Sequence, residues 1–484
     1  MNPLSASTLA LLSDTIKRPN YDRGDVKIGI VHLGLGGFHR AHQAAYTDAC
    51  LEKGDLKWGI LGASLRSPQT RDALAPQDGL YTLVARSSEV TDYRIIGSVI
   101  KVMVAPENPL ALVEAMAHPD VKIVSLTITE KGYCIDPSTG TLDEAHPDIR
   151  HDLAYLDQPV SAPGFIVAAL KQRRERGLKP FTVMSCDNLN ANGEKLRALI
   201  MAMALKVDPV LADFIGAQVA FPSTMVDRIV PHTVDEDRAA VSEVLGLKDA
   251  WPIVTEGFSQ WVIEDHFPEG RPNWHEVGAE LVHDVTPYET MKLRLLNGAH
   301  SMLALLGGIA GHATVADAMA DHALANFVEA FMVEDVSPVL SVPAGADLPS
   351  YRKALLQRFR NPALKHRLVQ IASDSSQKIP QRFLTTSRDR LSRGLPLGRL
   401  AFGIAAFVHY ASGFDRQGQP IELRDPMASE MKERLILAGP DAEKAVDAIL
   451  SVEKIFGTEL SVNPHFREPV IAAYRALAKG NPTL

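Results

Sequence analysis

Short apolar runs alternate with segments of helical periodicity from Lys27 to about Val219. Four near-continuous apolar runs are typical of parallel strands buried on both faces. These runs are Ile28–Leu33, Trp58–Gly62, Ile123–Ile128 and Phe181–Met184. The intervening helical segments are Ala41–Lys53, Pro109–Ala117, Phe165–Arg176 and Gly193–Ala204. Leu80–Ala85 and Tyr93–Val99 alternate like a hairpin that extends the sheet. The pattern predicts an α/β domain with a parallel sheet and covering helices.

After about Asp284 the strand signals end and helical periodicity continues. The predicted helices are Tyr288–Leu306, Val315–Met332, Leu348–Phe359, Leu397–Tyr410 and Ala442–Phe456. A chain of 484 residues exceeds what one hydrophobic core usually serves. We therefore expect two domains, an α/β domain over residues 1–284 and a mostly helical domain over residues 285–484.

The chain carries 50 Lys and Arg against 58 Asp and Glu, a formal charge of −8. This balance argues against a nucleic-acid or anionic-membrane partner, because both select for basic surface. No apolar stretch approaches the ~18 residues of a membrane helix, and the run Ser7–Leu12 lacks the basic start of a signal peptide. The three cysteines form no CxxC pair. We expect a reduced, cytoplasmic protein.

Glycines follow the first predicted strand at Gly34, Gly36 and Gly37, where a helix begins. A dinucleotide site needs this arrangement, because the pyrophosphate approaches the loop backbone and the helix N-terminus. The pattern predicts a Rossmann-type cofactor domain. His39 stands where a third glycine is usual, so a glycine turn in another α/β protein remains an alternative. The second strand ends without an acidic residue, and Arg66 could accept the 2′-phosphate of NADP.

Four polar side chains recur at helical spacing in the first helix of the second domain. At about 100° per residue, Glu289, Asn297 and His300 fall within about 140° of Lys292. Burying them is costly unless they face a polar cleft or one another. Such a face can oxidise an alcohol without a metal.

In this mechanism Lys292, with its pKa lowered by desolvation, takes the hydroxyl proton. Asn297 stabilises the alkoxide, His300 orients the substrate and Glu289 passes the proton to solvent. The alternative is a solvated pair of Lys292 and Glu289 beside a core histidine.

A second amide-rich segment, Met184–Gly193, lies between a predicted strand and a predicted helix. Ligands of α/β folds bind at this carboxyl edge of the sheet. Asn188 is therefore a candidate oxyanion donor, while Asp187 or Asn192 could be helix caps.

Six ordered motifs, which extend over most of the chain, together resemble the mannitol dehydrogenase family of long-chain polyol and uronate dehydrogenases. The motifs are Gly34–His42, Ser125–Cys134, Met184–Asn188, Met225–Pro231, Lys292–His300 and Gln377–Arg382. The resemblance implies a metal-independent, NAD-using enzyme with a Rossmann-type N-terminal domain and a helical C-terminal domain. It also implies an active site between the domains, and it is compatible with a monomer.

Residue by residue, the resemblance makes Lys292 the general base, Asn188 and Asn297 the oxyanion clamp, and His300 a substrate-orienting group. Glu289 would lie on the proton path. The residues implied at the cofactor are Gly34, Gly36, Gly37, Phe38, His39, Arg40, Thr127 and Glu130. The residues implied at the polyhydroxy substrate are Asp227 and Lys378.

Within the family, the segments Glu130–Gly132 and Gln370–Arg382 are more similar to the fructuronate reductases, also called mannonate oxidoreductases. Mannitol-type members have an arginine at the position of Gln370. A uronate carries a carboxylate, which requires an additional cation. Lys131 and Arg382 are the candidates, and each could instead be an exposed structural charge. A mannitol or related polyol dehydrogenase remains the alternative.

Mannitol-type members also have an aspartate just after the second strand, where this chain has Gln69 or Pro68. NADP therefore remains open beside NAD.

Three further interpretations compete with this one. Tyr288 and Lys292 fit the Tyr-x-x-x-Lys pair of short-chain dehydrogenases, although those enzymes are single domains of roughly half this length. His32, His39 and His42 lie near the glycine loop, but no cysteine or carboxylate joins them with zinc-ligand spacing. A non-catalytic dinucleotide sensor would have no need of the polar helix face.

Overall fold

The computed structural model describes residues 1–87, 89–136 and 139–478. The chain divides into two compact units, Met1–Thr286 and Pro287–Leu484. Among the described residues, no helix is long and apolar enough to cross a membrane.

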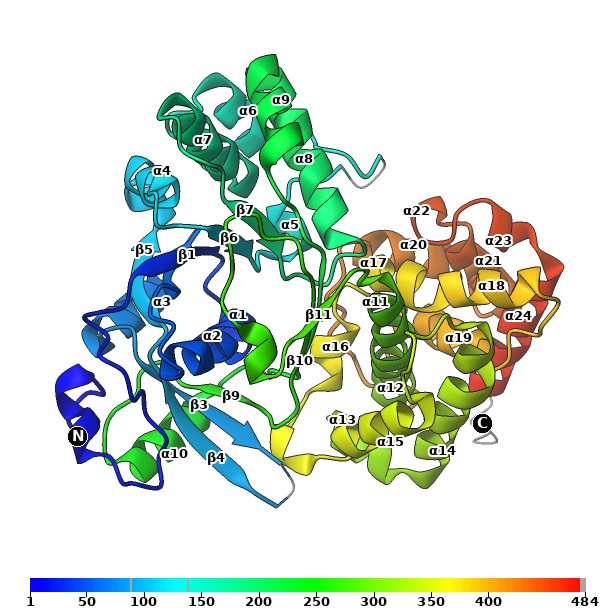
Figure 1. The fold of residues 1–484 in the computed structure, drawn as a ribbon. Helices are drawn as coiled ribbons and strands as arrows, with labels where there is room; N and C mark the ends of the chain where they lie inside the picture. Colours follow the sequence, from blue (N-terminus) through cyan, green and yellow to red (C-terminus); the bar gives the residue numbers. More distant parts are fainter. Residues whose placement is uncertain (88, 137–138, 479–484) are drawn as a thin grey trace. The chain divides into compact units, whose positions relative to one another are not determined.

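The amino-terminal unit is built on a five-stranded sheet whose strands are all parallel, in the order β5-β2-β1-β6-β7 (Figure 1). The strands are β1 (Ile28–Leu33), β2 (Gly59–Ser64), β5 (Val99–Val104), β6 (Ile123–Leu126) and β7 (Thr182–Ser185). Four of them coincide, within a few residues, with the predicted apolar runs. The chain passes from β1 outward to β5 and then returns past β1 to β6, which is the doubly wound order of a Rossmann-type domain.

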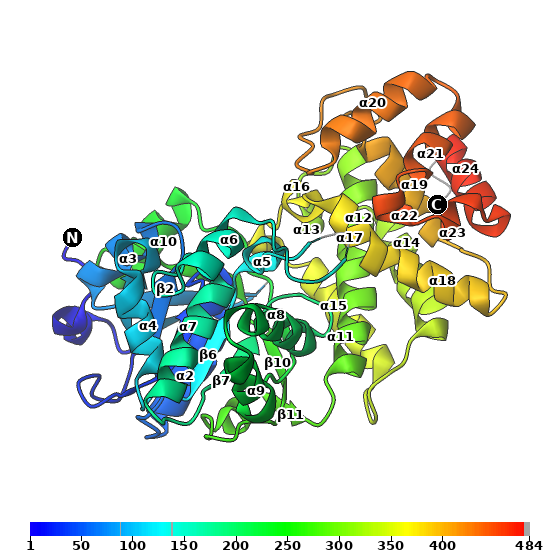
Figure 2. The same cartoon turned by 90° about the horizontal axis from the view of Figure 1, so that it is seen from above.

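Side chains alternate between the two faces of this sheet, and each face has its own core. Val31 and Leu33 pack in the core that includes α4 (Pro109–Ala117), α7 (Ala162–Glu175) and α8 (Asn192–Val207). Ile30 packs on the other side, in the core that includes residues of α2 (Gln43–Glu52). The views in Figures 1 and 2 show these helices around the sheet. Burial on both faces explains why the strands are continuously apolar.

The predicted hairpin forms, but it does not extend the main sheet. β3 (Tyr81–Arg86) and β4 (Thr91–Ile96) are antiparallel and pair with β9 (Ile253–Glu256) in a separate three-stranded sheet. A third sheet contains β8 (Thr224–Asp227), β10 (Gln260–Glu264) and β11 (Glu280–Val282). The hairpin's alternating pattern predicts strands but does not specify their partner, which here lies about 170 residues away in the chain.

The helix predicted over Ala41–Lys53 corresponds to α2, and a separate short helix precedes it. α1 (Gly37–Ala41) and α2 meet at His42, whose φ of −121° and ψ of −90° interrupt the helical path. The first helix therefore starts directly at the glycines and is only five residues long.

Helices dominate the carboxy-terminal unit, and its described residues form no strand beyond isolated bridges. Its helices of eight or more residues are α12 (Gly298–Ile309), α14 (His322–Ala330), α15 (Leu348–Phe359), α18 (Thr385–Ser392), α19 (Leu400–Tyr410), α20 (Ala428–Ala438), α21 (Ala442–Leu450) and α24 (Pro464–Ala478). The shorter ones are α11 (Thr286–Lys292), α13 (Val315–Ala320), α16 (Leu368–Ala372), α17 (Ser375–Ile379), α22 (Glu453–Phe456) and α23 (Glu459–Val462). The prediction of a Rossmann-type α/β domain followed by a mostly helical domain is confirmed.

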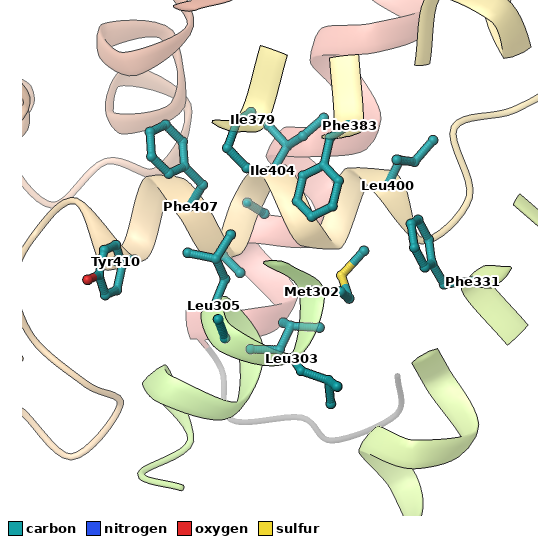
Figure 3. Close-up of a cluster of buried hydrophobic side chains, with 14 of the residues drawn as sticks. Met302, Leu303, Leu305, Phe331, Ile379, Phe383, Leu400, Ile404, Phe407 and Tyr410 are labelled. Carbon is teal, nitrogen blue, oxygen red and sulfur yellow. The ribbon is translucent and has the colours of Figure 1, made fainter. Parts of the chain in front are cut away.

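Helix α12 lies in the core of this unit and is buried on all sides except at Gly308. Met302 and Leu305 point from it toward α19 (Figure 3). The two helices approach closely at Gly403, where a Cβ would come within 2.8 Å of the Met302 side chain. Polar residues on a helix this buried need a compensating interaction.

Three π-helical segments interrupt the helices of this unit, at Leu293–Asn297, Phe331–Val336 and Pro380–Leu384. They contact one another. The continuous helix predicted over Tyr288–Leu306 is therefore α11, a π-helical segment and α12, and the helix predicted over Val315–Met332 is also divided. π-Helical turns are rare and occur often at functional sites.

Candidate functional site

The loop after β1 has a conformation that favours glycine. Gly34 has a φ of +92°, and a Cβ there would lie 2.2 Å from the carbonyl oxygen of Thr127. Gly36 is the N-cap of α1, and a Cβ at this position would meet only the Gly34 oxygen, at 3.7 Å. The backbone at Gly36 is therefore open to close approach, as a pyrophosphate site requires.

A chain of hydrogen bonds fixes this loop to the end of β6. Thr127 Oγ1 donates to the Gly34 carbonyl at 2.9 Å and lies 2.8 Å from His32 Nε2. His32 Nδ1 lies 2.8 Å from Ser125 Oγ. Because Thr127 gives its only hydroxyl proton to Gly34, we infer that His32 Nε2 donates to Thr127 and Nδ1 accepts from Ser125. Burial lowers the pKa of His32 to about 3, which keeps this ring neutral.

The glycine loop lines a cavity of about 690 Å³ at the carboxyl ends of β1, β2 and β6. Cofactor cavities of doubly wound sheets lie at this edge and have volumes of this order. Its polar lining side chains are Ser64, Arg66, Ser67, Gln69, Thr70, Thr127, Thr129, Lys131, Asp148 and Ser161. The residues present therefore fit a dinucleotide. Gly34, Gly36 and Thr127 lie where the cofactor prediction requires, and Lys131, predicted to meet the substrate, lines the same cavity.

Five residues predicted at the cofactor do not line this cavity. They are Gly37, Phe38, His39, Arg40 and Glu130. The His39 ring stacks on His32 with 3.5 Å between ring centroids, and the Phe38 ring stacks on His42 at 5.1 Å. The first contact packs α1 against β1, and the second joins α1 to the start of α2.

The side chain of Arg40 is buried elsewhere in the unit. Its guanidinium donates to the Trp251 carbonyl and lies over the rings of Tyr81 and Trp251, at 5.2 and 5.8 Å from their centroids. Burial lowers the pKa of Arg40 to about 10. The structure thus does not support Arg40 as a side-chain ligand of the cofactor, because this cation anchors α1 to the segment before β9.

The loop after β7 carries Asn188, which is exposed, and is fixed to β8 by Asn192. Asn192 Nδ2 donates to the Thr224 carbonyl at 2.9 Å, and Asn192 Oδ1 accepts from Thr224 N–H at 2.9 Å. Asp227, which is buried, ends the same strand. Asn192 is the first residue of α8 rather than its N-cap, so it connects the loop after β7 to β8 and does not act as a helix cap.

Asp187 fixes the loop that follows β6. Its carboxylate accepts hydrogen bonds from the backbone N–H of Ile128 at 2.9 Å and of Thr129 at 3.0 Å, and from Tyr133 Oη at 2.7 Å. Thr129 has a φ of +62°, which is costly for a β-branched residue. Asp187 is therefore not a helix cap. It maintains a strained turn whose residue Thr129 lines the cofactor cavity.

The polar face predicted in the second unit is buried. Lys292, Asn297 and His300 are 6%, 8% and 7% exposed, and Glu289 is half-buried. The π-helical segment between Lys292 and Gly298 winds more slowly than an α-helix. It therefore rotates Asn297 and His300 back toward Lys292, so the arc is narrower than the one predicted for a regular helix. Burial of Lys292 contradicts the alternative of a solvated ion pair.

His300 has a neutral ring with an unsatisfied nitrogen. Burial holds its pKa well below the usual value, and charge interactions with His366, Arg358, Arg382 and Lys292 lower it further. Its Nε2 is buried and has no hydrogen-bond partner among the described residues. A buried polar atom of this kind needs a partner, and a substrate hydroxyl would supply one. This contradicts the alternative of a satisfied core histidine.

Arg382 is tied to the same helix. Its Nη1 donates to Ser301 Oγ at 2.9 Å and to the Asn297 carbonyl at 3.4 Å. Lys378 Nζ donates to the carbonyl oxygens of Ile371 and Ser373. Lys378 and Arg382, two of the three predicted substrate cations, are thus held by the main chain or by a neighbouring hydroxyl. Arg382 lies beside the residues proposed for catalysis.

The histidines near the glycine loop take part in hydrogen bonds and ring stacking. Both ring nitrogens of His32 are used in the hydrogen bonds above. His42 Nε2 lies 2.9 Å from the Gln260 carbonyl, and its Nδ1 lies 3.1 Å from Gln43 Nε2. Within the described part of the chain, the one cluster with suitable ligand atoms within 4.8 Å of one another is Cys134, His146 and Asp148, which the sequence analysis did not identify.

Sequence reasoning also missed Arg358 of α15 and the Asp187–Thr129 interaction. Arg358 precedes Phe359, whose ring lies 4.6 Å from that of His300. The sequence does show a cation, Arg358, next to an aromatic residue. The position of Arg358 beside His300, however, depends on tertiary packing, which the sequence pattern does not specify. The positive φ of Thr129 leaves no trace in the residue type.

Comparison with known protein families matches both units. Residues 28–276 match the mannitol dehydrogenase Rossmann domain, and residues 284–478 match the mannitol dehydrogenase C-terminal domain. The chain belongs to the mannitol dehydrogenase family. It is therefore an oxidoreductase, which confirms the resemblance found from the six motifs.

Similar family members have different descriptions. An uncharacterized oxidoreductase of Escherichia coli (strain K12), YeiQ, is 44% identical over 99% of this chain and 97% of its own length. D-mannonate oxidoreductase of Escherichia coli (strain K12) is 45% identical over 96% of each chain. A solved structure of Pseudomonas fluorescens mannitol 2-dehydrogenase, a ternary complex with NAD and D-mannitol, is 41% identical with a TM-score of 0.92. It covers 99% of this chain and 98% of its own. The family of the chain is therefore established, but sequence identity to these relatives does not distinguish between their substrates.

Proposed function

We propose that this mannitol dehydrogenase family member interconverts D-mannonate and D-fructuronate with NAD as cofactor. The D-mannonate oxidoreductase relative supports the substrate class, and the NAD complex of the mannitol 2-dehydrogenase supports the cofactor. The glycine loop and the cavity at the carboxyl edge of the sheet fit the dinucleotide. The reaction is oxidation of a secondary alcohol, with no metal needed.

The observation that carries the substrate assignment is the charge around His300. Lys292, Arg358 and Arg382 all act on this residue, and each lowers its pKa. Arg358 and Arg382 are two permanent cations near this buried ring, and the Lys292 ammonium adds a third charge when it holds the proton. Positive charges around one buried ring favour an anionic ligand, because an anion offsets their mutual repulsion. A uronate or aldonate carries such a charge, and a neutral polyol does not.

Bound NAD would accept the hydride from the carbon that bears the reacting hydroxyl. Lys292 takes the hydroxyl proton as the carbonyl forms, and Glu289 passes it to solvent. The side-chain amides of Asn188 and Asn297 donate hydrogen bonds to the developing negative oxygen. In the reverse direction the Lys292 ammonium returns the proton to the ketone oxygen.

The remaining residues orient the substrate. The free Nε2 of His300 pairs with a substrate hydroxyl, and Asp227 and Lys378 bind further hydroxyls. Arg382 pairs with the carboxylate in a charge-assisted contact, for which a guanidinium has the right shape. Lys131 lines the cofactor cavity, and we therefore assign it to the phosphates in preference to the substrate.

A substrate comparison tests this proposal. With NADH as reductant, kcat/KM for fructuronate should exceed that for fructose by about 10²-fold or more, as expected for one desolvated charge pair. Arg382→Gln should lower kcat/KM for fructuronate by about 10²-fold and change fructose reduction far less.

Arg399→Gln is the matched control for this variant. Arg399 is a half-buried arginine of the same unit that pairs with Glu334 and does not act on His300. The Arg399→Gln variant should leave the ratio of kcat/KM for fructuronate to kcat/KM for fructose unchanged. A preference for fructose would instead assign a mannitol 2-dehydrogenase, and no turnover of any ketose would leave a dinucleotide-binding sensor.

A further inference from the structure

The end of β2 supplies one wall of the cofactor cavity and has an unusual charge. In doubly wound folds, the residue at this position meets the adenosine ribose, and a carboxylate here selects the free 2′-hydroxyl of NAD. The segment from Ser64 to Thr70 has no carboxylate. Its lining residues are Ser64, Leu65, Arg66, Ser67, Gln69 and Thr70. The side-chain charge at this wall is positive.

The Arg66 guanidinium is available for a ligand. It is exposed and makes no hydrogen bond or ion pair with any residue that the structure describes. By contrast, Arg71, five residues later, is held by Asp72 at 2.7 Å and by Glu107 at 2.5 and 3.0 Å. The two neighbouring arginines thus differ in two respects. Arg66 lines the cavity and has no ion-pair partner among the described residues, whereas Arg71 lies outside the lining and is paired with two carboxylates.

The other charges of the cavity do not cancel this cation. Lys131 adds a second positive charge, and Asp148 is the one carboxylate among the lining residues. Asp148 Oδ2 lies 4.0 Å from His146 Nδ1, and its carboxylate belongs to the cluster with Cys134 described above. Arg66 lines the cavity and forms no ion pair with Asp148 or with any other described carboxylate.

We propose that this cavity binds 2′-phosphorylated dinucleotides, so that the enzyme uses NADP(H) as well as NAD(H), and that Arg66 binds the 2′-phosphate. Guanidinium and phosphate form a two-pronged, charge-assisted contact. Ser67 and Thr70 provide hydroxyl donors on the same wall. The inference deepens the proposed dehydrogenase function and rests on the same cofactor cavity.

Direct binding tests the proposal without turnover. NADPH and NADH are titrated into the full-length protein and their fluorescence is followed, and adenosine 2′,5′-bisphosphate is compared with adenosine 5′-phosphate by calorimetry. We expect the Kd of NADPH to lie within tenfold of that of NADH. Arg66→Gln should raise the NADPH/NADH ratio of Kd values at least tenfold.

Two further variants keep the result interpretable. Arg71→Gln removes the same charge outside the cavity and should leave the ratio unchanged. Ser67→Asp adds a carboxylate to the wall and should raise the ratio by repelling the phosphate, which tests the subsite even if Arg66→Gln fails to fold. A wild-type ratio above one hundred, or a ratio that neither cavity variant raises, overturns the proposal.

The outcomes separate this inference from the proposed function. Binding and turnover with NADH alone would overturn the NADP inference and leave the dehydrogenase function intact. Binding of NADPH without turnover of any ketose or uronate would support the subsite and overturn the proposed reaction. Failure of both dinucleotides to bind would overturn both.

Discussion

Lys292 is a buried cation on a helix whose surroundings are apolar. It is 6% exposed, and Met291, Leu295 and Leu296 beside it belong to the hydrophobic core. Removing a lysine from such a place would ordinarily relieve an unfavourable burial. A buried lysine near a histidine nitrogen that has no hydrogen-bond partner among the described residues is therefore best explained by chemistry.

We expect Lys292→Met to lower kcat by about 10²–10⁴-fold, the usual contribution of a general base, while NADH still binds. The methionine keeps the length and the packing of the side chain. Added primary amines should restore part of the activity of Lys292→Ala, since they replace the missing base. Steady-state rates and NADH fluorescence titrations provide the two measurements.

Tyr288→Phe is the control on the same helix. Near-complete activity of this variant would exclude the Tyr-x-x-x-Lys mechanism, in which tyrosine is the acid. Parent-like turnover by Lys292→Met across the pH range would contradict the proposed base.

The individual residues show what spacing can and cannot predict. Lys292, Asn297 and His300 were identified because helical periodicity places them on one face, and their burial agrees with that face being functional. A glycine-loop motif specifies the path of the backbone and not the direction of the side chains that follow, and Arg40, predicted at the cofactor, does not line the cavity. Its guanidinium instead packs between two aromatic rings.

At the level of elements, the strands of the main sheet follow from their apolar runs, and α4 and α15 have the predicted limits. The π-helical segments could not be predicted, because an i to i+5 hydrogen bond depends on packing around the helix and not on residue type. The hairpin pairs with β9 and not with the main sheet, and this pairing likewise depends on a strand from a distant part of the chain.

The turn after β6 is an element whose conformation depends on one carboxylate. Asp187→Asn replaces an acceptor with an N–H₂ donor near the amides of Ile128 and Thr129, and we expect it to destabilise the turn by about 1–3 kcal/mol. The Kd for NADH should increase more than kcat decreases, because Thr129 lines the cofactor cavity. Fluorescence titration and thermal unfolding measure the two effects.

Adding Thr129→Gly to this variant should recover part of the cofactor affinity, since glycine adopts a positive φ without strain. Asp249→Asn is the matched control, because Asp249 is a buried carboxylate that accepts from Gln77, Thr82 and Trp251 and does not line the cavity. It should lower stability without weakening NADH binding. Equal weakening by both variants would show that Asp187 acts only through global stability.

For the whole molecule, buried neutral histidines in both units link stability to pH. The pKa of His32 is lowered to about 3, and the pKa values of His39 and His300 are held well below the usual value, in each case first by burial. In the unfolded chain these rings titrate near pH 6.5. Between that pH and the folded pKa, the unfolded state therefore binds more protons than the native state.

Stability must then fall as the pH is lowered through this window. Each such histidine contributes a slope of up to about 1.4 kcal/mol per pH unit, so Tm should decrease markedly from pH 7 to pH 5, where most carboxylates are still ionised.

His32→Gln retains a donor and an acceptor but cannot be protonated. It should lower Tm at pH 7 and reduce the loss of stability between pH 6.5 and 5. The exposed His118, changed to Gln, should alter neither value, and identical pH slopes for His32→Gln and the parent would show that this ring is protonated in the folded protein.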